Sequence, residues 1–348
     1  MNAFSDNYIK IAIDVMGGDH GLSTTIPAVL SIISDNLKNK KNVHFYLYGD
    51  EEKIKSYLIK HNTLIDYITI CHADDFVSPD DKPSFAVRNR KQSGMYKALM
   101  DLRRKGVDAV VSSGNTGALM AISKIMLGTL VGINRPALVG VIPHKYKKGV
   151  IVLDFGADID ADSETLVQFA IMGSYFCRQL FDIDNPRVSL LNIGTEDIKG
   201  KDSIKKASDI LSNEEKRNFN FIGYIEPSSV FNEDVDVMVT DGFTGNIFLK
   251  SIQGAIKYTL HSIKENIGIF SKIVIYFLLF FRFKKIKRKI DASQYNGAMF
   301  VGLNGIVIKS YGSADVKSFK SAINVAIKMV EGNINSQLIQ ECGMELSK

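Results

Sequence analysis

The sequence predicts an α/β protein, a three-layer α/β/α arrangement around a mostly parallel, Rossmann-like sheet. Two observations predict it. Short β-branched runs alternate with helix-length periodic segments along all 348 residues, and several of the strand-like runs end in glycine-containing polar loops. No repeat or low-complexity linker interrupts this alternation, so we expect a single large domain over residues 1–348.

The strand and helix assignments follow from composition and periodicity. Runs rich in Val, Ile, Tyr and Leu predict strands at 9–15, 43–48, 67–71, 107–112, 149–154, 187–193, 219–224, 235–240 and 305–309. Amphipathic periodicity predicts helices at 24–37, 84–105, 117–127, 164–181, 203–211, 245–265 and 318–330.

Composition narrows the class of protein. Hydrophobic residues make up 45% and charged residues 23%, as in ordinary globular proteins, and the net charge of +5 is mild. Much of the excess lies in one basic run at 282–289, which predicts an acidic partner or a membrane surface and no nucleic acid. Three isolated cysteines and an N-terminus without an apolar signal segment predict a cytoplasmic protein.

Polar, glycine-containing loops follow five of the predicted strands, at 16–21, 112–117, 155–158, 194–197 and 240–246. Ligands of open α/β sheets bind beyond the carboxyl ends of the strands, so five such loops predict one composite site. Any one of them could be ordinary turn chemistry, since Gly, Asn and Asp are common turn residues.

The chemistry of these loops favours an anion. Glycine-rich loops that enter helices present backbone N–H groups and a positive dipole end, which suits phosphate. No dinucleotide or P-loop spacing is present, and no His or Cys spacing typical of zinc, so we expect no nucleotide, cofactor or metal. There is also no G-x-S-x-G motif, so a covalent acyl-serine intermediate has no support. Cys71 ends an apolar strand, where a lone cysteine is usually a packing residue.

Five segments resemble the bacterial phosphate acyltransferase family (PlsX): IAIDVMGGDH at 11–20, SGNTGAL at 113–119, LLNIGTED at 190–197, TDGFTGN at 240–246 and NGA at 296–298. The resemblance continues through 135–138, 167–174 and 305–310. It implies a fold similar to phosphotransacetylases and isocitrate-dehydrogenase-like proteins. It also implies a homodimer that makes acyl phosphate from long-chain acyl-[acyl carrier protein] and inorganic phosphate, early in bacterial phospholipid biosynthesis.

The resemblance nominates Lys199 and Asn246 as catalytic residues, one neutralising phosphate and the other donating to phosphate or to the developing oxyanion. The alternatives are a solvated loop lysine and a plain helix N-cap. The substrate- or phosphate-binding candidates are Asp14, Gly17, Gly18, His20, Arg88, Ser113, Gly114, Asn115, Thr116, Asp154, Asp241, Gly242 and Lys309.

Two positions depart from the family pattern. Asp158 stands where the family usually has Asn, and a carboxylate there would repel phosphate, so we expect it to point away or to pair with a cation. Tyr311 stands where the family usually has His. An unperturbed tyrosine stays neutral near pH 7, so we expect Tyr311 to have a positioning role.

A helical arm is predicted over 247–292. Its apolar stretch, 267–281, is followed directly by the basic run and is too short to span a bilayer, which needs about 20 apolar residues. We expect peripheral contact with the inner face of the membrane through Phe277, Leu278 and Phe281, alongside an acyl-phosphate-using glycerol-3-phosphate acyltransferase. Contact with the carrier protein or with a second subunit is the alternative.

Two other functions fit the same residues. One is a short-chain phosphate acyltransferase that uses acyl-CoA on the same fold. The other is a non-catalytic, membrane-bound scaffold for lipid enzymes, for which the strand-end loops would be dispensable and the arm essential.

Overall fold

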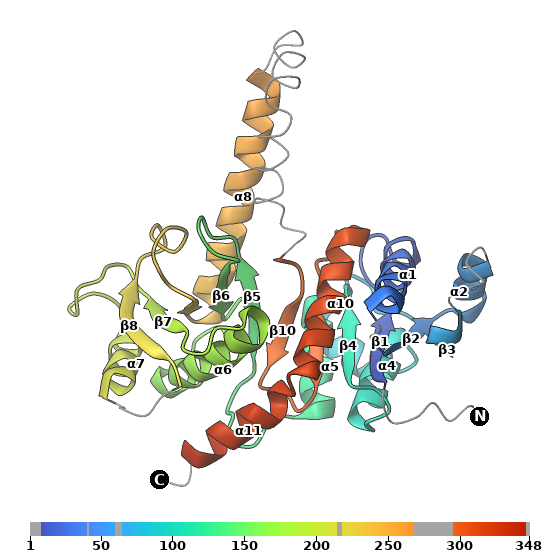
Figure 1. Ribbon diagram of the computed structural model, residues 1–348, viewed down its shortest axis with the longest axis horizontal. Helices are drawn as coiled ribbons and strands as arrows, with labels where there is room; N and C mark the ends of the chain where they lie inside the picture. Colours follow the sequence, from blue (N-terminus) through green and yellow to red (C-terminus); the bar gives the residue numbers. More distant parts are fainter. Residues whose placement is uncertain (1–7, 40–41, 60–64, 214–217, 267–294, 346–348) are drawn as a thin grey trace.

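An 11-stranded sheet, in the order β3-β2-β1-β4-β11-β10-β5-β6-β9-β7-β8, runs through the protein (Figure 1). The computed structural model describes residues 8–39, 42–59, 65–213, 218–266 and 295–345. The strands are β1 (Ile9–Asp14), β2 (Val43–Gly49), β3 (Ile68–His72), β4 (Ala109–Ser112), β5 (Ala137–Ile142), β6 (Val150–Leu153), β7 (Arg187–Leu191), β8 (Asn220–Ile225), β9 (Val237–Val239), β10 (Ala298–Val301) and β11 (Ile306–Lys309).

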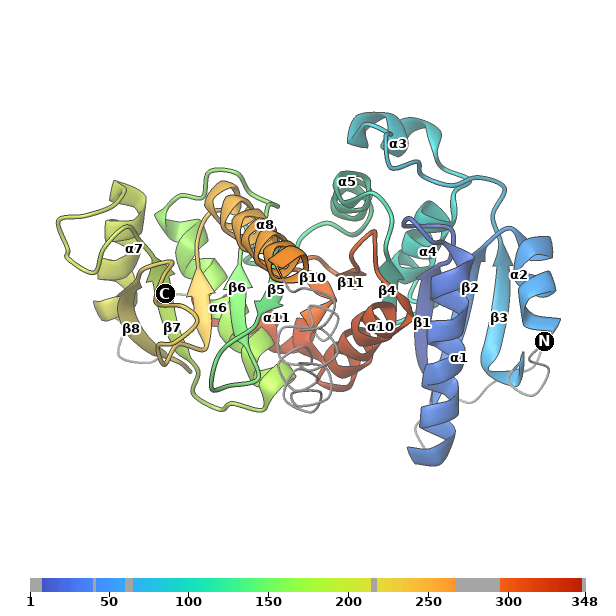
Figure 2. The ribbon, with the colours of Figure 1, turned by 90° about the horizontal axis from the view of Figure 1, so that it is seen from above.

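Helices cover both faces of the sheet (Figure 2). They are α1 (Leu22–Asn39), α2 (Glu51–Leu58), α3 (Pro83–Asn89), α4 (Gly94–Arg103), α5 (Thr116–Leu127), α6 (Ser163–Phe181), α7 (Asp202–Asn213), α8 (Gly242–Asn266), α10 (Val316–Glu331) and α11 (Ile334–Glu345). Because side chains alternate along a strand, Ile11 and Ile13 belong to the apolar cluster on the face of α1, α6 and α10, while Ala12 belongs to the cluster on the face of α4 and α5. The predicted three-layer fold is confirmed.

Two strands in the middle of the sheet, β5 and β10, were missed by the sequence analysis. They pair antiparallel with each other, and also with β11 and β6, whereas the other seven pairings are parallel. A proline precedes β5, and Gly297, with a φ of 118°, precedes the four-residue β10. These short runs lack a helical partner of the kind that marks parallel strands, and they divide the sheet into two parallel sets.

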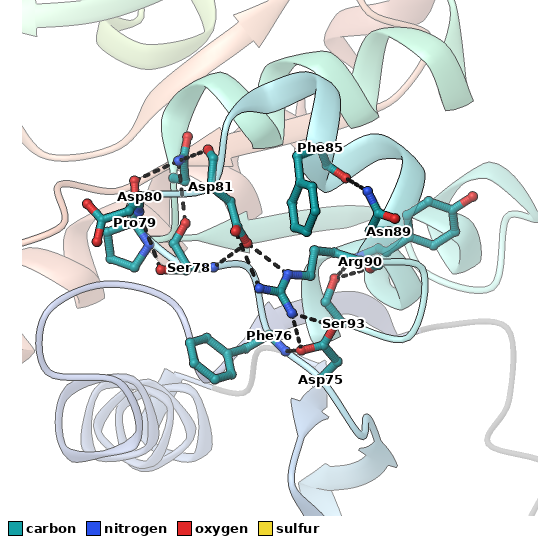
Figure 3. Close-up of polar contacts among 12 residues, drawn as sticks. Asp75, Phe76, Ser78, Pro79, Asp80, Asp81, Phe85, Asn89, Arg90 and Ser93 are labelled. Atoms are coloured by element: carbon teal, nitrogen blue, oxygen red, sulfur yellow. Dashed lines mark hydrogen bonds and ion pairs between the residues drawn. The ribbon is translucent and has the colours of Figure 1, made fainter.

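The single helix predicted at 84–105 is wrong, because the chain breaks between α3 and α4. Ser93 caps α4 by accepting a hydrogen bond from the backbone N–H of Tyr96 at 3.2 Å. In the break, the Arg90 guanidinium bridges two carboxylates, with Nε 2.8 Å from Asp81 Oδ2 and Nη1 3.1 Å from Asp75 Oδ1 (Figure 3). This clamp fixes where α3 lies.

Helix α8 projects away from the body of the protein (Figure 1). It begins at Gly242, three residues before the predicted start, and is described to Asn266. The remainder of the predicted arm, including Phe277, Leu278 and Phe281, lies outside the described residues. Within the described part of the chain, no helix is long and apolar enough to cross a membrane.

Candidate active site at the start of helix α8

Three strand-end loops meet at the first turn of α8. They follow β6 (154–158), β7 (192–201) and β9 (240–246), and we call them together the α8 site. The backbone N–H of Gly242 donates to the Asp158 carbonyl at 2.7 Å, which joins two of the loops. A Cβ at Gly242 would lie 2.6 Å from Asp154 Oδ2 and from that same carbonyl, so only glycine fits there.

Asp154, predicted to bind substrate or phosphate, shapes the loop after β6. Its buried carboxylate accepts backbone N–H bonds from Leu138 at 2.7 Å, Gly156 at 3.0 Å, Ala157 at 2.8 Å and Asp158 at 2.6 Å. Both oxygens are occupied, and neither can donate to an anion. Its contacts therefore support a structural role and give no support to direct phosphate binding.

Asn246 lies in the first turns of α8 and is half-buried. Its side chain covers Gly156, where an added Cβ would meet the Asn246 amide at 3.6 Å. The helix cap is Asp241, whose Oδ1 accepts the Thr244 N–H at 2.7 Å, so Asn246 is not the N-cap. Among the described residues the Asn246 side-chain amide has no hydrogen-bond partner, which leaves it available to a ligand.

Lys199 lies on the exposed loop after β7. Its ammonium forms an ion pair with Glu196 at 2.8 Å, and this bond raises the pKa of Lys199. The backbone is better fixed than the side chain, because Asn192 Nδ2 donates to the Lys199 carbonyl at 3.2 Å. An exposed ion pair of this kind is weak, so the Lys199 ammonium can exchange Glu196 for a bound anion.

Lys201 was missed by the sequence analysis. Its ammonium lies 3.2 Å from Asp241 Oδ2, and this ion pair connects the loop that carries Lys199 to the start of α8. Asp241 and Gly242, both predicted to bind phosphate, therefore cap and shape the helix start. A lysine in a polar loop gives no sequence signal of this contact, because its partner is 40 residues away.

Asp158 pairs with a cation, as expected. Its Oδ1 lies 2.9 Å from Arg135 Nη1, while its Oδ2 is buried without a hydrogen-bond partner among the described residues. Arg135 belongs to the loop before β5, so the ion pair also ties the middle of the sheet to the α8 site.

The loops after β1, β4 and β11 form a second cluster, which we call the β1–β4 cluster (residues 14–21, 112–117 and 309–312). Ser113 Oγ donates to the Gly17 carbonyl at 2.9 Å. A Cβ at Gly17 would come within 2.7 Å of the Gly114 backbone nitrogen, and one at Gly18 within 2.6 Å of Ser113 Oγ. The structure brings these predicted residues together, but they bond to each other, and their contacts do not support direct phosphate binding by Ser113.

Asn115, predicted to donate to phosphate, has another role. Its Oδ1 caps α5 by accepting the Ala118 N–H at 3.0 Å, and its Nδ2 donates to the carbonyls of Pro79 and Asp81, each at 2.9 Å. All its polar atoms are occupied, so the prediction of a phosphate ligand is not supported. Nearby Thr116 and His20 are exposed.

Asp14 and Lys309 are the buried charges of the β1–β4 cluster. Asp14 Oδ2 accepts from Ser112 Oγ at 2.7 Å, and Lys309 Nζ donates to the carbonyls of Ser113 and Ser310. Burial raises the pKa of Asp14 to about 6 and lowers the pKa of Lys309 to about 8. The attraction between the two charges opposes both shifts.

The five loops fall into two clusters, and the single composite site stays a prediction. Strands β10 and β5 lie between β11 and β6, so three strand spacings, about 14 Å in a flat sheet, separate them. Across this gap, Tyr311, after β11, interacts with the side chain of Gln253 of α8, which lowers the pKa of Tyr311 against the larger effect of burial. Arg88, predicted to bind phosphate, is exposed in the last turn of α3 and forms no ion pair with a described residue.

The arrangement of the sheet defines an α/β enzyme fold of the phosphotransacetylase class. A phosphotransacetylase from Streptococcus pyogenes shares this fold with a TM-score of 0.59, 15% identity, and coverage of 94% of this chain and 95% of the other. The EutD phosphotransacetylase from Staphylococcus aureus has a TM-score of 0.58 and 17% identity, with the same coverage of both chains. At these identities the likeness shows the fold alone.

Sequence comparison then gives the family. The family profile described as "Fatty acid synthesis protein" matches residues 9–337. A phosphate acyltransferase from Ehrlichia chaffeensis is 42% identical over 336 residues, 96% of this chain and 98% of that protein. One from Wolbachia pipientis wMel is 40% identical over 96% of both chains. The chain belongs to this phosphate acyltransferase family and is an acyltransferase, which confirms the resemblance read from the sequence.

Proposed function

We propose that this protein transfers a long-chain acyl group from acyl-[acyl carrier protein] to inorganic phosphate, and that the reaction takes place at the α8 site. The observation that carries the proposal is the amide of Asn246, which has no hydrogen-bond partner among the described residues. It lies at the positive end of α8, and the Lys201–Asp241 ion pair connects that helix start to the loop of Lys199.

The reaction needs little acid–base help. A phosphate oxygen attacks the thioester carbonyl carbon, and a tetrahedral intermediate forms with the negative charge on the former carbonyl oxygen. This intermediate collapses as the carbon–sulfur bond breaks. Hydrogen phosphate and the thioester thus give an acyl phosphate dianion and a thiol, and the proton that the phosphate carried ends on sulfur. Catalysis therefore consists of positioning two reactants and stabilising an oxyanion.

The α8 site supplies groups for both tasks. In this proposal the Lys199 ammonium leaves Glu196 and neutralises the phosphate, and the Asn246 amide donates to the oxyanion. The N-terminal end of α8 adds a positive dipole end. None of these groups titrates near neutrality in the role assigned to it, which matches a reaction without a general base.

Purified protein, palmitoyl-[acyl carrier protein] and phosphate test the proposal. We expect thiol release that requires phosphate, with acyl phosphate visible by phosphorus NMR. Acetyl-CoA in place of the carrier thioester distinguishes the short-chain enzyme. If no thioester supports acyl phosphate formation, the scaffold function replaces the proposed one.

The cellular role belongs to the same proposal. We infer a homodimer at the inner face of the membrane, where a glycerol-3-phosphate acyltransferase uses the acyl phosphate in bacterial phospholipid synthesis. Phe277, Leu278 and Phe281 remain the proposed membrane contacts. Replacing them with Ser should release the protein from anionic vesicles and leave acyl phosphate formation intact. A triple variant that becomes monomeric and inactive would instead identify an assembly surface.

A further inference from the structure

Five large apolar side chains are exposed around the α8 site. Ile159, Ile193, Ile198, Phe243 and Ile247 expose 71, 77, 85, 58 and 51% of their surface, respectively. Single exposed apolar side chains are common on proteins, but a group of them around one polar site marks a binding surface. We call these five residues the apolar rim.

A backbone hydrogen bond brings the helix side and the β6 side of the rim together. The 2.7 Å bond from the Gly242 N–H to the Asp158 carbonyl joins residues that directly precede Phe243 and Ile159. The backbones that carry Phe243 and Ile159 therefore lie close together at this bond. Both side chains face solvent, whereas an apolar side chain at a loop junction could have packed inward.

The helical repeat places more of the rim beside the proposed reaction centre. Phe243 and Ile247 are four residues apart on α8, so they share one face of the helix, and Asn246 lies three residues after Phe243 on that face. The amide proposed to stabilise the oxyanion thus lies one helical turn from the exposed side chain of Phe243.

The β7 loop completes the rim. The 3.2 Å ion pair between Lys201 and Asp241 holds this loop against the start of α8. Within the loop, the Lys199 side chain folds over Gly194, where a Cβ would meet Lys199 Cδ at 2.3 Å. Ile193 and Ile198, which precede those two residues, thus both lie on this exposed loop beside the start of α8.

We propose that the apolar rim binds the acyl chain of the thioester, and this inference rests on the proposed function. Substrate and product are both amphiphiles with a polar or anionic head and an apolar tail. The α8 site has the complementary pattern, with the amide of Asn246 and two ammonium groups at its centre and apolar side chains around them. A long chain laid on the rim removes apolar surface from water on both partners, so affinity rises with chain length.

Alanine variants of Phe243 and Ile198 test the inference, with KM measured for palmitoyl- and butyryl-[acyl carrier protein]. We expect each variant to raise KM for the palmitoyl substrate about tenfold, the scale of one lost apolar side-chain contact, and for the butyryl substrate less than twofold. Tyr146→Ala is the matched control. Tyr146 is 72% exposed, like Ile159, but lies before β6 whereas Ile159 lies after it.

Several outcomes would overturn the inference. An equal rise in KM for both chain lengths would show that the rim contacts the carrier protein. A change in molar mass by light scattering would assign the rim to a second copy of this chain, and lost vesicle binding with an unchanged palmitoyl KM would assign it to a membrane. If the triple variant of Ile193, Ile198 and Phe243 to Ala keeps the wild-type ratio of the two KM values, the rim does not bind the acyl chain.

Calorimetric binding of the two carrier thioesters without phosphate separates this inference from the proposed function. One outcome is binding that depends on chain length and weakens in the variants while wild type forms no acyl phosphate. That result would reject the proposed function and support the acyl-chain role of the rim. If the variants form acyl phosphate but wild type and variants bind both chain lengths equally well, the acyl-chain role of the rim is rejected and the proposed function stands.

Discussion

The two strand-end clusters differ in how their polar groups are used. In the β1–β4 cluster, Ser112 bonds to Asp14, Ser113 bonds to Gly17, and Asn115 is occupied at every polar atom. In the α8 site, the Asn246 amide has no partner among the described residues, and Lys199 is held only by an exposed ion pair. The polar side chains of Ser112, Ser113 and Asn115 in the first cluster are thus taken up by internal hydrogen bonds, whereas the Asn246 amide of the second is not.

This difference shows that motif density is a poor guide to where chemistry occurs. Backbones that approach closely need glycine and short hydroxyl side chains, whether or not a ligand is bound. A functional site needs polar groups that lack hydrogen-bond partners within the protein, at a place that solvent can reach. By that criterion we propose the α8 site as the reaction centre, and the β1–β4 cluster as the frame that fixes one side of it.

The largest expected effect is on turnover in the α8 site. Lys199→Ala should reduce the rate of acyl phosphate formation on the order of a hundredfold, the usual scale for one preorganised electrostatic contact. Its stability to denaturant should match wild type, because the side chain is exposed. Lys205→Ala is the control, since among the described residues the Lys205 ammonium bonds only to the Ile198 carbonyl in the same region. An equal loss of turnover in both variants would show that the effect comes from disorder of the loop and not from the missing Lys199 ammonium.

In the β1–β4 cluster the expected effect is on stability. Asn115→Ala removes the α5 cap and the hydrogen bonds to Pro79 and Asp81, so the free energy of unfolding should fall by roughly 1–3 kcal/mol. Asn115→Asp keeps the cap and should lose less. Turnover per folded molecule should stay within a few-fold of wild type. A stable Asn115→Ala variant with a hundredfold lower turnover would instead make Asn115 a ligand.

The pH dependence of stability sharpens the same comparison. Asp14 has a folded pKa of about 6, above its ordinary 3.8, so the folded state holds this proton more tightly than the unfolded state. Its contribution to stability is complete below about pH 4 and is lost as pH rises through 6. Relative to Asp14→Asn, wild type should lose on the order of 1–3 kcal/mol between these limits in denaturant titrations. Parallel curves for the two proteins would mean that Asp14 is not held in this way.

The smallest expected effect is at the bridge between the clusters. Burial raises the pKa of Tyr311, so this residue stays neutral near pH 7. Tyr311→His should add a titration near neutrality to the pH–rate profile, because imidazole changes charge there. Tyr311→Phe, which removes the bond to Gln253, should leave the shape of the profile unchanged. Identical profiles for wild type and Tyr311→His would show that position 311 does not report on the chemistry.

Much of the architecture could be predicted from the sequence, because apolar periodicity follows burial. Helix α6, predicted at 164–181, begins one residue earlier, and β2 extends one residue beyond its prediction. Pairing direction could not be predicted for β5 and β10, whose short apolar runs carry no signal of their neighbours. The cation expected beside Asp158 was confirmed, but its identity as Arg135 was set by the fold.

The sequence predicted which types of residue lie in the strand-end loops, but it predicted the role of each residue less well. Asn115 and Asn246 both precede apolar helical residues after a glycine-containing strand end, and in sequence they look alike. Only the fold shows that the amide of Asn115 meets two carbonyls of the loop before α3, while that of Asn246 lies over Gly156 without a hydrogen-bond partner among the described residues. Whether all the polar atoms of a side chain have hydrogen-bond partners depends on the tertiary structure, so a single sequence does not show it.

The most direct test of the account compares Asn246→Ala and Ser113→Ala in one assay of acyl phosphate formation from palmitoyl-[acyl carrier protein] and phosphate. Both variants remove one polar side chain from a strand-end loop. We predict about a hundredfold loss of turnover for Asn246→Ala and less than a fivefold change for Ser113→Ala. The opposite pattern, a severe loss for Ser113→Ala and near-normal turnover for Asn246→Ala, would place the chemistry in the β1–β4 cluster and contradict the account.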